Sequence, residues 1–214
     1  MNSYMRRFHV VLLLFCIAFP LTAIDNDTYL EVANDVLSGE PDLRDFTELR
    51  EAFTQTSWYN PAPDRTWLQE LDAAIDAGEY EQADEFINSN YFYFLPVMDF
   101  HLAAMATYRE IDDEETREWH DWFFQRLIDS VFESGDGEST ETAYTTIYER
   151  EQMIALEVLG LELQERRQEE RGDRLFYVYE TRDPEGNDRD VYFDFTAAKR
   201  WREQQQQGQN DDER

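Results

Sequence analysis

The sequence predicts an α+β protein in which helical hairpins are followed by a small strand-helix-β-hairpin module. Two observations predict this class. Up to Ser134, apolar residues recur three or four positions apart, which is the spacing of one face of a helix. After Gly135, short runs rich in β-branched and aromatic residues are separated by turn signals, as in strands. The expected organisation is a signal peptide over 1–23, helical hairpins over 24–134, the small module over 135–196 and a disordered tail over 197–214.

The first 23 residues have the three-part layout of a secretory signal peptide. Arg6 and Arg7 precede the apolar run 10–19, and the small residue Ala23 marks the expected cleavage site. The apolar run is too short to span a membrane as a helix, which needs about 20 apolar residues. We therefore expect an exported protein, located in the periplasm or the medium, whose mature chain begins near Ile24 and is not inserted in a membrane.

The helical region contains six apolar stripes, each of which predicts a helix. Helix-breaking residues separate the first stripes. Gly39 and Pro41 follow the first stripe, the Pro-containing loop 58–63 follows the second, and Gly78 follows the third. The turn 77–84 resembles the joint inside a tetratricopeptide-type helix pair. Amphipathic helices joined by short turns bury their stripes against each other, so we expect stacked antiparallel hairpins. The stripes run from Tyr29 to Leu37, Leu43 to Phe53, Trp67 to Ile75, Tyr80 to Ile87, Val97 to Tyr108 and Trp119 to Phe132.

The small module is expected to alternate between strands and helices. Its clearest signal is the turn 183–187, Asp-Pro-Glu-Gly-Asn, which lies between two alternating runs and predicts a β-hairpin. The expected elements are a strand over 142–148, a helix over 149–160, a second helix over 161–171, and hairpin strands over 175–181 and 190–195.

Two segments of the module resemble an uncharacterised bacterial family. They are 134–164, SGDGESTETAYTTIYEREQMIALEVLGLELQ, and the closing run VYFDFT at 191–196. Both are similar to the exported domain-of-unknown-function family 4919, and the resemblance covers about 45–196. It implies export and a helical front half followed by strands, and it implies no activity.

The chain is strongly acidic, with 48 Asp and Glu residues, 19 Lys and Arg residues and a net charge of −29. Such a surface repels phosphates, which argues against a nucleic acid partner or an anionic membrane surface. Lys199 is the only lysine. A carboxylate-rich, lysine-poor surface is typical of proteins that work in high salt, and codon usage that favours arginine would give the same composition.

Asp136 and Glu138 are the candidate carboxylates for chemistry, since they lie in the block Gly-Asp-Gly-Glu-Ser at 135–139. The block is compatible with a cation site or an anion-binding backbone nest. It is also compatible with a turn in which the glycines end a helix and Ser139 or Thr140 starts the next element. The spacing does not match a calcium-binding loop, so the turn is the simpler interpretation.

No metal site is predicted, although His101 and His120 lie near Asp99 and Asp121 in the sequence. Residues one or two positions apart on a helix point to different sides, so neither Asp–His pair converges on one ion. Cys16 is the only cysteine and leaves with the signal peptide. The mature chain is therefore expected to have no disulfide, thiolate metal site or cysteine nucleophile.

Aromatic residues at two expected helix junctions are the candidate binding residues, namely Trp58, Tyr59, Tyr91 and Tyr93. They either form wedges between helix pairs or line a groove for a peptide or glycan. The sequence contains no nucleophile elbow, phosphate loop, dinucleotide fingerprint or HExxH motif. We therefore expect a non-catalytic binding or scaffolding module of the cell envelope, without a cofactor, whose partner is an envelope protein, a peptide or a glycan. The alternatives are a hydrolase outside the cytoplasm that uses Asp136 and Glu138, and cation storage on the acidic surface.

Overall fold

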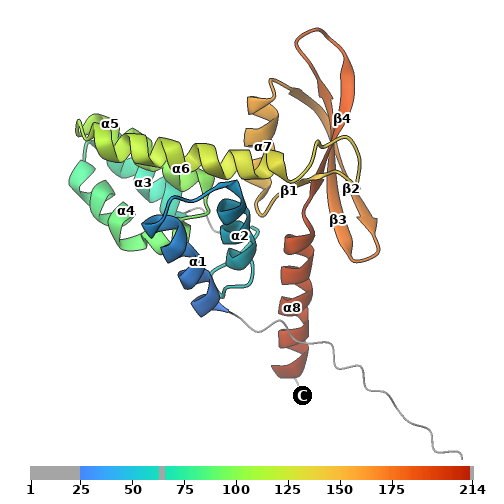
Figure 1. The fold of residues 1–214 in the computed structure, drawn as a ribbon, viewed down its shortest axis with the longest axis horizontal. Helices are drawn as coiled ribbons and strands as arrows, with labels where there is room; N and C mark the ends of the chain where they lie inside the picture. The colour runs from blue at the N-terminus through green and yellow to red at the C-terminus, as the bar shows by residue number, and fades with distance from the viewer. Residues whose placement is uncertain (1–24, 63–65, 213–214) are drawn as a thin grey trace, which may run out of the picture.

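The computed structural model describes residues 25–62 and 66–212 of the chain. The predicted signal peptide lies outside these residues. The described residues form eight helices and a four-stranded mixed sheet, with helices alone in the first half and strands in the second, which confirms the α+β class. Figure 1 shows the helical layer beside the sheet, with α7 between them.

The elements follow the expected order along the chain. The helical layer consists of α1 (Asn26–Ser38), α2 (Leu43–Phe53), α3 (Thr66–Ala77), α4 (Tyr80–Phe94), α5 (Met98–Glu110) and α6 (Glu114–Glu133). The module consists of β1 (Tyr144–Thr145), α7 (Glu149–Val158), β2 (Glu162–Arg171), β3 (Arg174–Arg182), β4 (Asp188–Asp194) and α8 (Thr196–Asp212). The resemblance of the α3–α4 turn to a tetratricopeptide joint stays a prediction.

Acidic caps fix where several helices begin. The carboxylate of Asp25 accepts from the backbone N–H of Thr28 at the start of α1. Asp42 and Asp45 form a reciprocal capping box at the start of α2. Asp113 caps α6 in the same way as Asp25 caps α1. Each carboxylate satisfies free N–H groups and lies at the positive end of a helix dipole, so part of the chain's acidity stabilises its helices.

The sheet has the strand order β1-β4-β3-β2, with β1 parallel to β4 and the other neighbours antiparallel. Alternate residues of β3, Leu175, Tyr177 and Tyr179, are buried in the main hydrophobic core. The hydroxyl of Tyr179 donates to Oε1 of Gln152 in α7 at 2.6 Å, which fixes this helix against the inner face of the sheet.

The outer face of the sheet carries arginines and carboxylates. Arg167 bridges Glu180 of β3 and Asp190 of β4, with N···O distances of 3.2 and 2.6 Å. The guanidinium of Arg174 lies 4.6 Å from the ring centroid of Phe176, which is nearly fully buried. On this face the charged group of an arginine therefore lies over an aromatic ring, which is a cation–π contact.

The helical layer and the module share one hydrophobic core. The main cluster contains Phe46 and Leu127 from the helical layer together with Ile154, Tyr179 and Phe193 from the module. A second cluster, built around α3, α4 and α5, includes Leu71 and Phe100. The predicted boundary at 134–135 therefore divides types of secondary structure and does not divide the core.

Two expectations about the second half of the chain were wrong. The segment 161–171 was expected to be a helix. It contains the strand β2 instead, because β3 offers a partner to every residue of β2 except Gln164, where the register shifts. Strong helix formers are overridden here by tertiary pairing. The tail 197–214 was expected to be disordered, and residues up to Asp212 belong to α8. The first turns of α8 are held by Trp201, which packs against the core, and by Lys199, whose Nζ donates to the Gly172 carbonyl at 2.9 Å.

Two other elements differ from their expected lengths. The strand expected over 142–148 is reduced to Tyr144–Thr145, because only these residues pair with β4. The helix expected to end near Ile87 continues through the aromatic run to Phe94. The aromatic side chains of that run therefore project from the last turns of α4 rather than from a loop.

Candidate functional site

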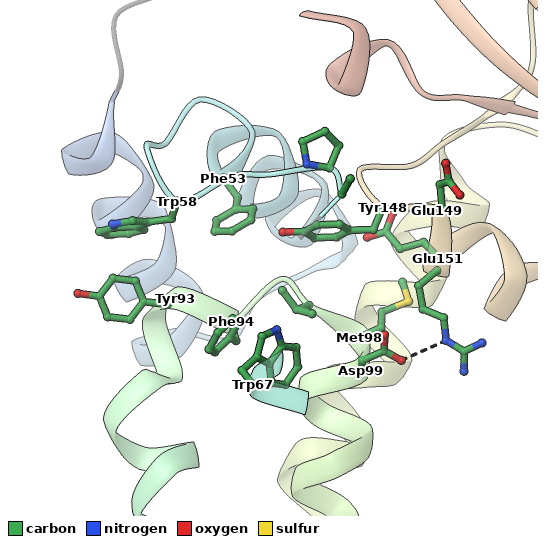
Figure 2. A pocket seen from close by; sticks show the side chains of 14 residues that line it. Phe53, Trp58, Trp67, Tyr93, Phe94, Met98, Asp99, Tyr148, Glu149 and Glu151 are labelled. Atoms are coloured by element: carbon green, nitrogen blue, oxygen red, sulfur yellow. Dashed lines mark hydrogen bonds and ion pairs between the residues drawn. The ribbon is translucent and has the colours of Figure 1, made fainter. Parts of the chain in front are cut away.

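A cavity of about 350 Å³ lies where the helical layer meets the module (Figure 2). Its described lining comes from the end of α2 and the loop after it, from α3, from the α4–α5 junction, and from the start of α7. Pockets that bind small groups are typically of this size and are formed mainly by apolar and aromatic side chains. Both the helical layer and the module contribute to the cavity, so it is not merely a gap between two neighbouring helices.

Six aromatic side chains among the described residues line the cavity. Figure 2 shows Trp58, Phe53 and Tyr148 in one row and Tyr93, Phe94 and Trp67 in a row that faces it. The rings of Trp58 and Tyr93 meet edge to face with centroids 4.8 Å apart, and those of Trp67 and Phe94 stack at 4.5 Å. Tyr93 is 45% exposed, so this ring pair is open to solvent on the Tyr93 side. The cavity thus presents ring edges and faces to solvent.

Charged residues surround one end of the cavity. Arg150 donates from Nε to Oδ1 of Asp99 at 3.1 Å, which joins the start of α7 to the start of α5. Glu149 pairs with Arg166 of β2, also at 3.1 Å. These pairs are partly exposed, so each contributes little to stability but places charge beside the apolar lining.

A buried ion pair lies behind this end of the cavity. Nη2 of Arg50 in α2 is 2.8 Å from Oε2 of Glu151 in α7, and both side chains are at most 3% exposed. The same Nη2 donates to the carbonyl of Thr145 at 3.0 Å, and Oε2 of Glu151 accepts from the N–H of Ile147 at 2.8 Å. Nε of Arg50 and Oε1 of Glu151 have no hydrogen-bond partner among the described residues. The pair and its backbone partners fix the start of α7 relative to α2.

The predicted binding residues divide between the cavity and the core. Trp58 and Tyr93 line the cavity. Tyr59 is buried, and its hydroxyl donates to the carbonyl of Ile147 at 2.9 Å. Tyr91 is half-buried and packs against Trp119, with ring centroids 5.4 Å apart.

Sequence reasoning missed Trp67, Phe94 and Tyr148 as lining residues. Trp67 belongs to a helical stripe and Tyr148 to a run expected to be a strand, so neither position signals a cavity. Phe94 belongs to the same aromatic run as Tyr93, and that run was the available signal.

The Gly-Asp-Gly-Glu-Ser block forms a turn that attaches to the sheet. Oδ1 of Asp136 accepts from the N–H of Glu138 at 2.9 Å and from Oγ1 of Thr142 at 2.5 Å. The bond from Thr142, and then the bond from the Glu138 backbone, hold the pKa of Asp136 below its ordinary value. The carbonyl of Gly137 accepts from the N–H of Tyr192 in β4 at 2.9 Å. Asp136 and Glu138 also line a separate cavity of about 290 Å³.

The two described histidines form a buried pair between α5 and α6. Nδ1 of His101 is 2.9 Å from Nδ1 of His120, and Nε2 of His101 is 2.9 Å from the carbonyl oxygen of Leu95. A carbonyl oxygen can only accept, so Nε2 of His101 carries a proton and Nδ1 accepts from His120 when both rings are neutral. Burial lowers the pKa of His101 to about 3, with a contribution from His120, and burial lowers the pKa of His120 to about 4.

Neither carboxylate near these histidines in the sequence joins them in a cluster. Asp99 instead pairs with Arg150. In the part of the chain that the structure describes, no group of three or more His, Cys, Asp or Glu side chains is placed to hold a metal ion. None of the described helices combines the length and the apolar character needed to cross a membrane.

The fold and the cavity define a helical layer packed on a small mixed sheet, with an aromatic cavity at the junction. The model of the family described as domain of unknown function (DUF4919) matches residues 41–204, which is more than half of the chain. The chain belongs to this family. No curated protein matches the chain. No solved structure matches it either.

The geometry of the turn at 135–139 predicts that substitution of Gly137 strongly lowers the free energy of unfolding. A Cβ at Gly137 would overlap the ring of Tyr144, whereas a Cβ at Gly160 meets nothing within 4 Å, and both glycines have positive φ. Gly160→Ala is therefore the matched control for backbone strain and should cost about 1 kcal/mol of unfolding free energy. Gly137→Ala should cost at least about 2 kcal/mol more, because the ring must move. Urea unfolding measures both values, and equal costs would show that the turn does not need this close approach.

The histidine pair predicts a loss of stability in mild acid. Both rings have an ordinary pKa near 6.5 when unfolded and a lower pKa when folded, so the folded state binds fewer protons and loses stability as pH falls below about 6.5. Each histidine should account for a loss of about 1–2 kcal/mol between pH 7 and pH 5. His101→Gln and His120→Gln should each reduce this slope when unfolding free energy is measured at both pH values. A slope unchanged in both variants would contradict the assignment.

Proposed function

We propose that the protein is a non-catalytic binding or scaffolding module of the cell envelope that captures an apolar side chain of a partner peptide in the aromatic cavity. The observation that carries this proposal is the edge-to-face contact at the cavity between Trp58, which is half-buried, and Tyr93, which is exposed. Aromatic side chains contribute large contact area at low entropic cost, which is why they anchor many protein interfaces. Export is part of the proposal and is supported by the signal-like sequence of residues 1–23.

The lining favours a peptide over a glycan. Sugar recognition needs many hydrogen-bonding groups, whereas most of this cavity is lined by rings and aliphatic groups. The charged groups at its end, Asp99, Arg150 and Glu149, already take part in ion pairs. An aromatic or branched aliphatic side chain therefore fits the cavity better than a polyhydroxylated ring.

The charge on α3 and α4, two of the helices that line the cavity, favours a partner that carries basic residues. The chain has no Lys or Arg from Thr66 to Tyr108, a segment that contains α3, α4 and most of α5. Seven carboxylates lie on α3, α4 and the turn between them: Glu70, Asp72, Asp76, Glu79, Glu81, Asp84 and Glu85. Such a field raises the association rate of cationic segments and repels acidic ones. We therefore propose a peptide ligand in which Lys or Arg residues flank one large apolar side chain.

The alternative of a carboxylate-dependent hydrolase has less support. The Asp136 carboxylate accepts two hydrogen bonds within its own turn, and its lowered pKa does not suit a general acid. Loss of turnover in Asp136→Asn, with the fold retained, would support this alternative once a substrate is known.

Substitution in the cavity should weaken peptide capture without unfolding the protein. Peptides selected from a random displayed library against the wild-type protein would serve as probes. Trp58→Ala and Tyr93→Ala should each raise the Kd of these peptides by at least about tenfold, because a central aromatic contact is lost. Phe92→Ala is the matched control, since Phe92 is an exposed aromatic residue next to Tyr93 on α4 that does not line the cavity.

Two results of this experiment would count against the proposal. One is equal affinity of the peptides for wild type and for both cavity variants. The other is a set of selected peptides without basic or large apolar residues. Thermal unfolding of each variant shows whether the fold is retained, so that lost binding is not confused with unfolding.

A further inference from the structure

The two edges of the sheet differ in how far they are open to pairing. At one edge, β1 contains only two residues, and the turn at Gly137 bonds to Tyr192 of β4 beside it. At the other edge, β2 has ten residues and pairs with β3 alone among the described strands (Figure 1). Eight of its ten side chains are exposed, and those of Arg167 and Glu169 are partly exposed. A long open edge offers unpaired backbone N–H and C=O groups to another strand.

The charges along β2 have an unusual symmetry. Residues 165–171 read Glu-Arg-Arg-Gln-Glu-Glu-Arg. Reversing the order of these residues about Gln168 replaces every charge by its opposite. A strand with this pattern is electrostatically complementary to a second copy of itself running in the antiparallel direction.

We propose that two copies of this chain associate through β2, antiparallel and centred on Gln168, to form one continuous sheet with a two-fold axis. In this register Glu165 faces Arg171 of the second copy, and the symmetry repeats the contact. Arg166 faces Glu170 and Arg167 faces Glu169 in the same way, so every charged residue in 165–171 meets an opposite charge. The two Gln168 side chains meet at the axis, as an isologous interface requires.

Neighbouring registers do not give this match. A shift of one residue in one direction places Glu165 opposite Glu170, and a shift in the other places Arg166 opposite Arg171. A shift of two residues brings two arginines or two glutamates together at the axis itself. Like charges directly opposite each other oppose pairing, so the charges on β2 select one register and exclude its neighbours.

The outer face of the sheet is compatible with this pairing. Arg167 already contacts Glu180 and Asp190 of its own chain. Glu169 of the second copy would join this cluster from the open side, and Glu165 would pair with Arg171. The pairing extends an ion-pair network that exists within one copy, and it does not require charges to be buried.

Charge-reversal variants test the proposal, with the dimer Kd measured by sedimentation equilibrium. The salt concentration is about 0.15 M, because the repulsion between two acidic chains is then screened beyond about 8 Å. Glu165→Arg places arginine opposite Arg171, and Arg171→Glu places glutamate opposite Glu165. Each variant alone should raise the dimer Kd by at least about tenfold, because two ion pairs become two repulsive contacts. An equimolar mixture of the two variants should form a heterodimer with a Kd close to that of wild type.

Glu162→Arg is the matched control, because it makes the same change of charge on β2 outside the complementary segment. It should leave the dimer intact. The proposal is overturned if wild type stays monomeric up to millimolar concentration, if Glu165→Arg dimerises as wild type does, or if mixing the two variants does not restore association. Circular dichroism of each variant establishes that β2 and the rest of the fold are retained.

Discussion

Arg50 and Glu151 lie 101 positions apart in the sequence, yet their side chains form an ion pair that is almost completely buried. Removing two charges from water costs several kcal/mol per ion, so such a pair is stable only when other hydrogen bonds accompany it. Those bonds come from the segment just before α7, through the carbonyl of Thr145 and the N–H of Ile147. Ser130 of α6 adds a contact with Arg50 at 3.4 Å. The pair therefore connects α2, α6 and the start of α7, and the position of the module on the helical layer depends on it.

The cavity follows from this constraint. Tyr148 and Glu149 lie three and two residues before Glu151, so fixing the start of α7 also places them opposite the α4–α5 junction. The module contributes the lining residues 148–151, and the other described lining residues come from the helical part of the chain, so both parts are needed to form the cavity. The acidic character of the chain has two separate consequences. Carboxylates cap helices such as α2, and α3 and α4 carry carboxylates but no Lys or Arg. On the outer face of the sheet arginine offsets part of the acidic charge, since Arg167 contacts three carboxylates there.

The sequence was sufficient to predict elements with strong local signals. The helices of the first half follow from their apolar stripes, and the β3–β4 hairpin follows from the turn 183–187. β2 could not be predicted, because its charged sequence lacks alternation and becomes a strand only through β3. Trp58 and Tyr93 could be identified from the sequence as aromatic residues at helix junctions. The contact of His101 with His120, by contrast, depends on how α5 packs on α6. Local patterns predict elements, whereas contacts between elements decide the site.

A double-mutant cycle on the buried ion pair tests most directly whether it joins the two parts of the chain. The free energy of unfolding in urea would be measured for wild type, Arg50→Met, Glu151→Gln and the double variant. We expect each single substitution to cost about 3–5 kcal/mol, because it leaves a buried charge without its partner. The double variant should lose far less unfolding free energy than the two single variants together, which gives a coupling energy of about 2 kcal/mol or more. Wild type should unfold in a single transition. Additive costs within about 0.5 kcal/mol, or separate transitions for the helical layer and the module in wild type, would contradict this account.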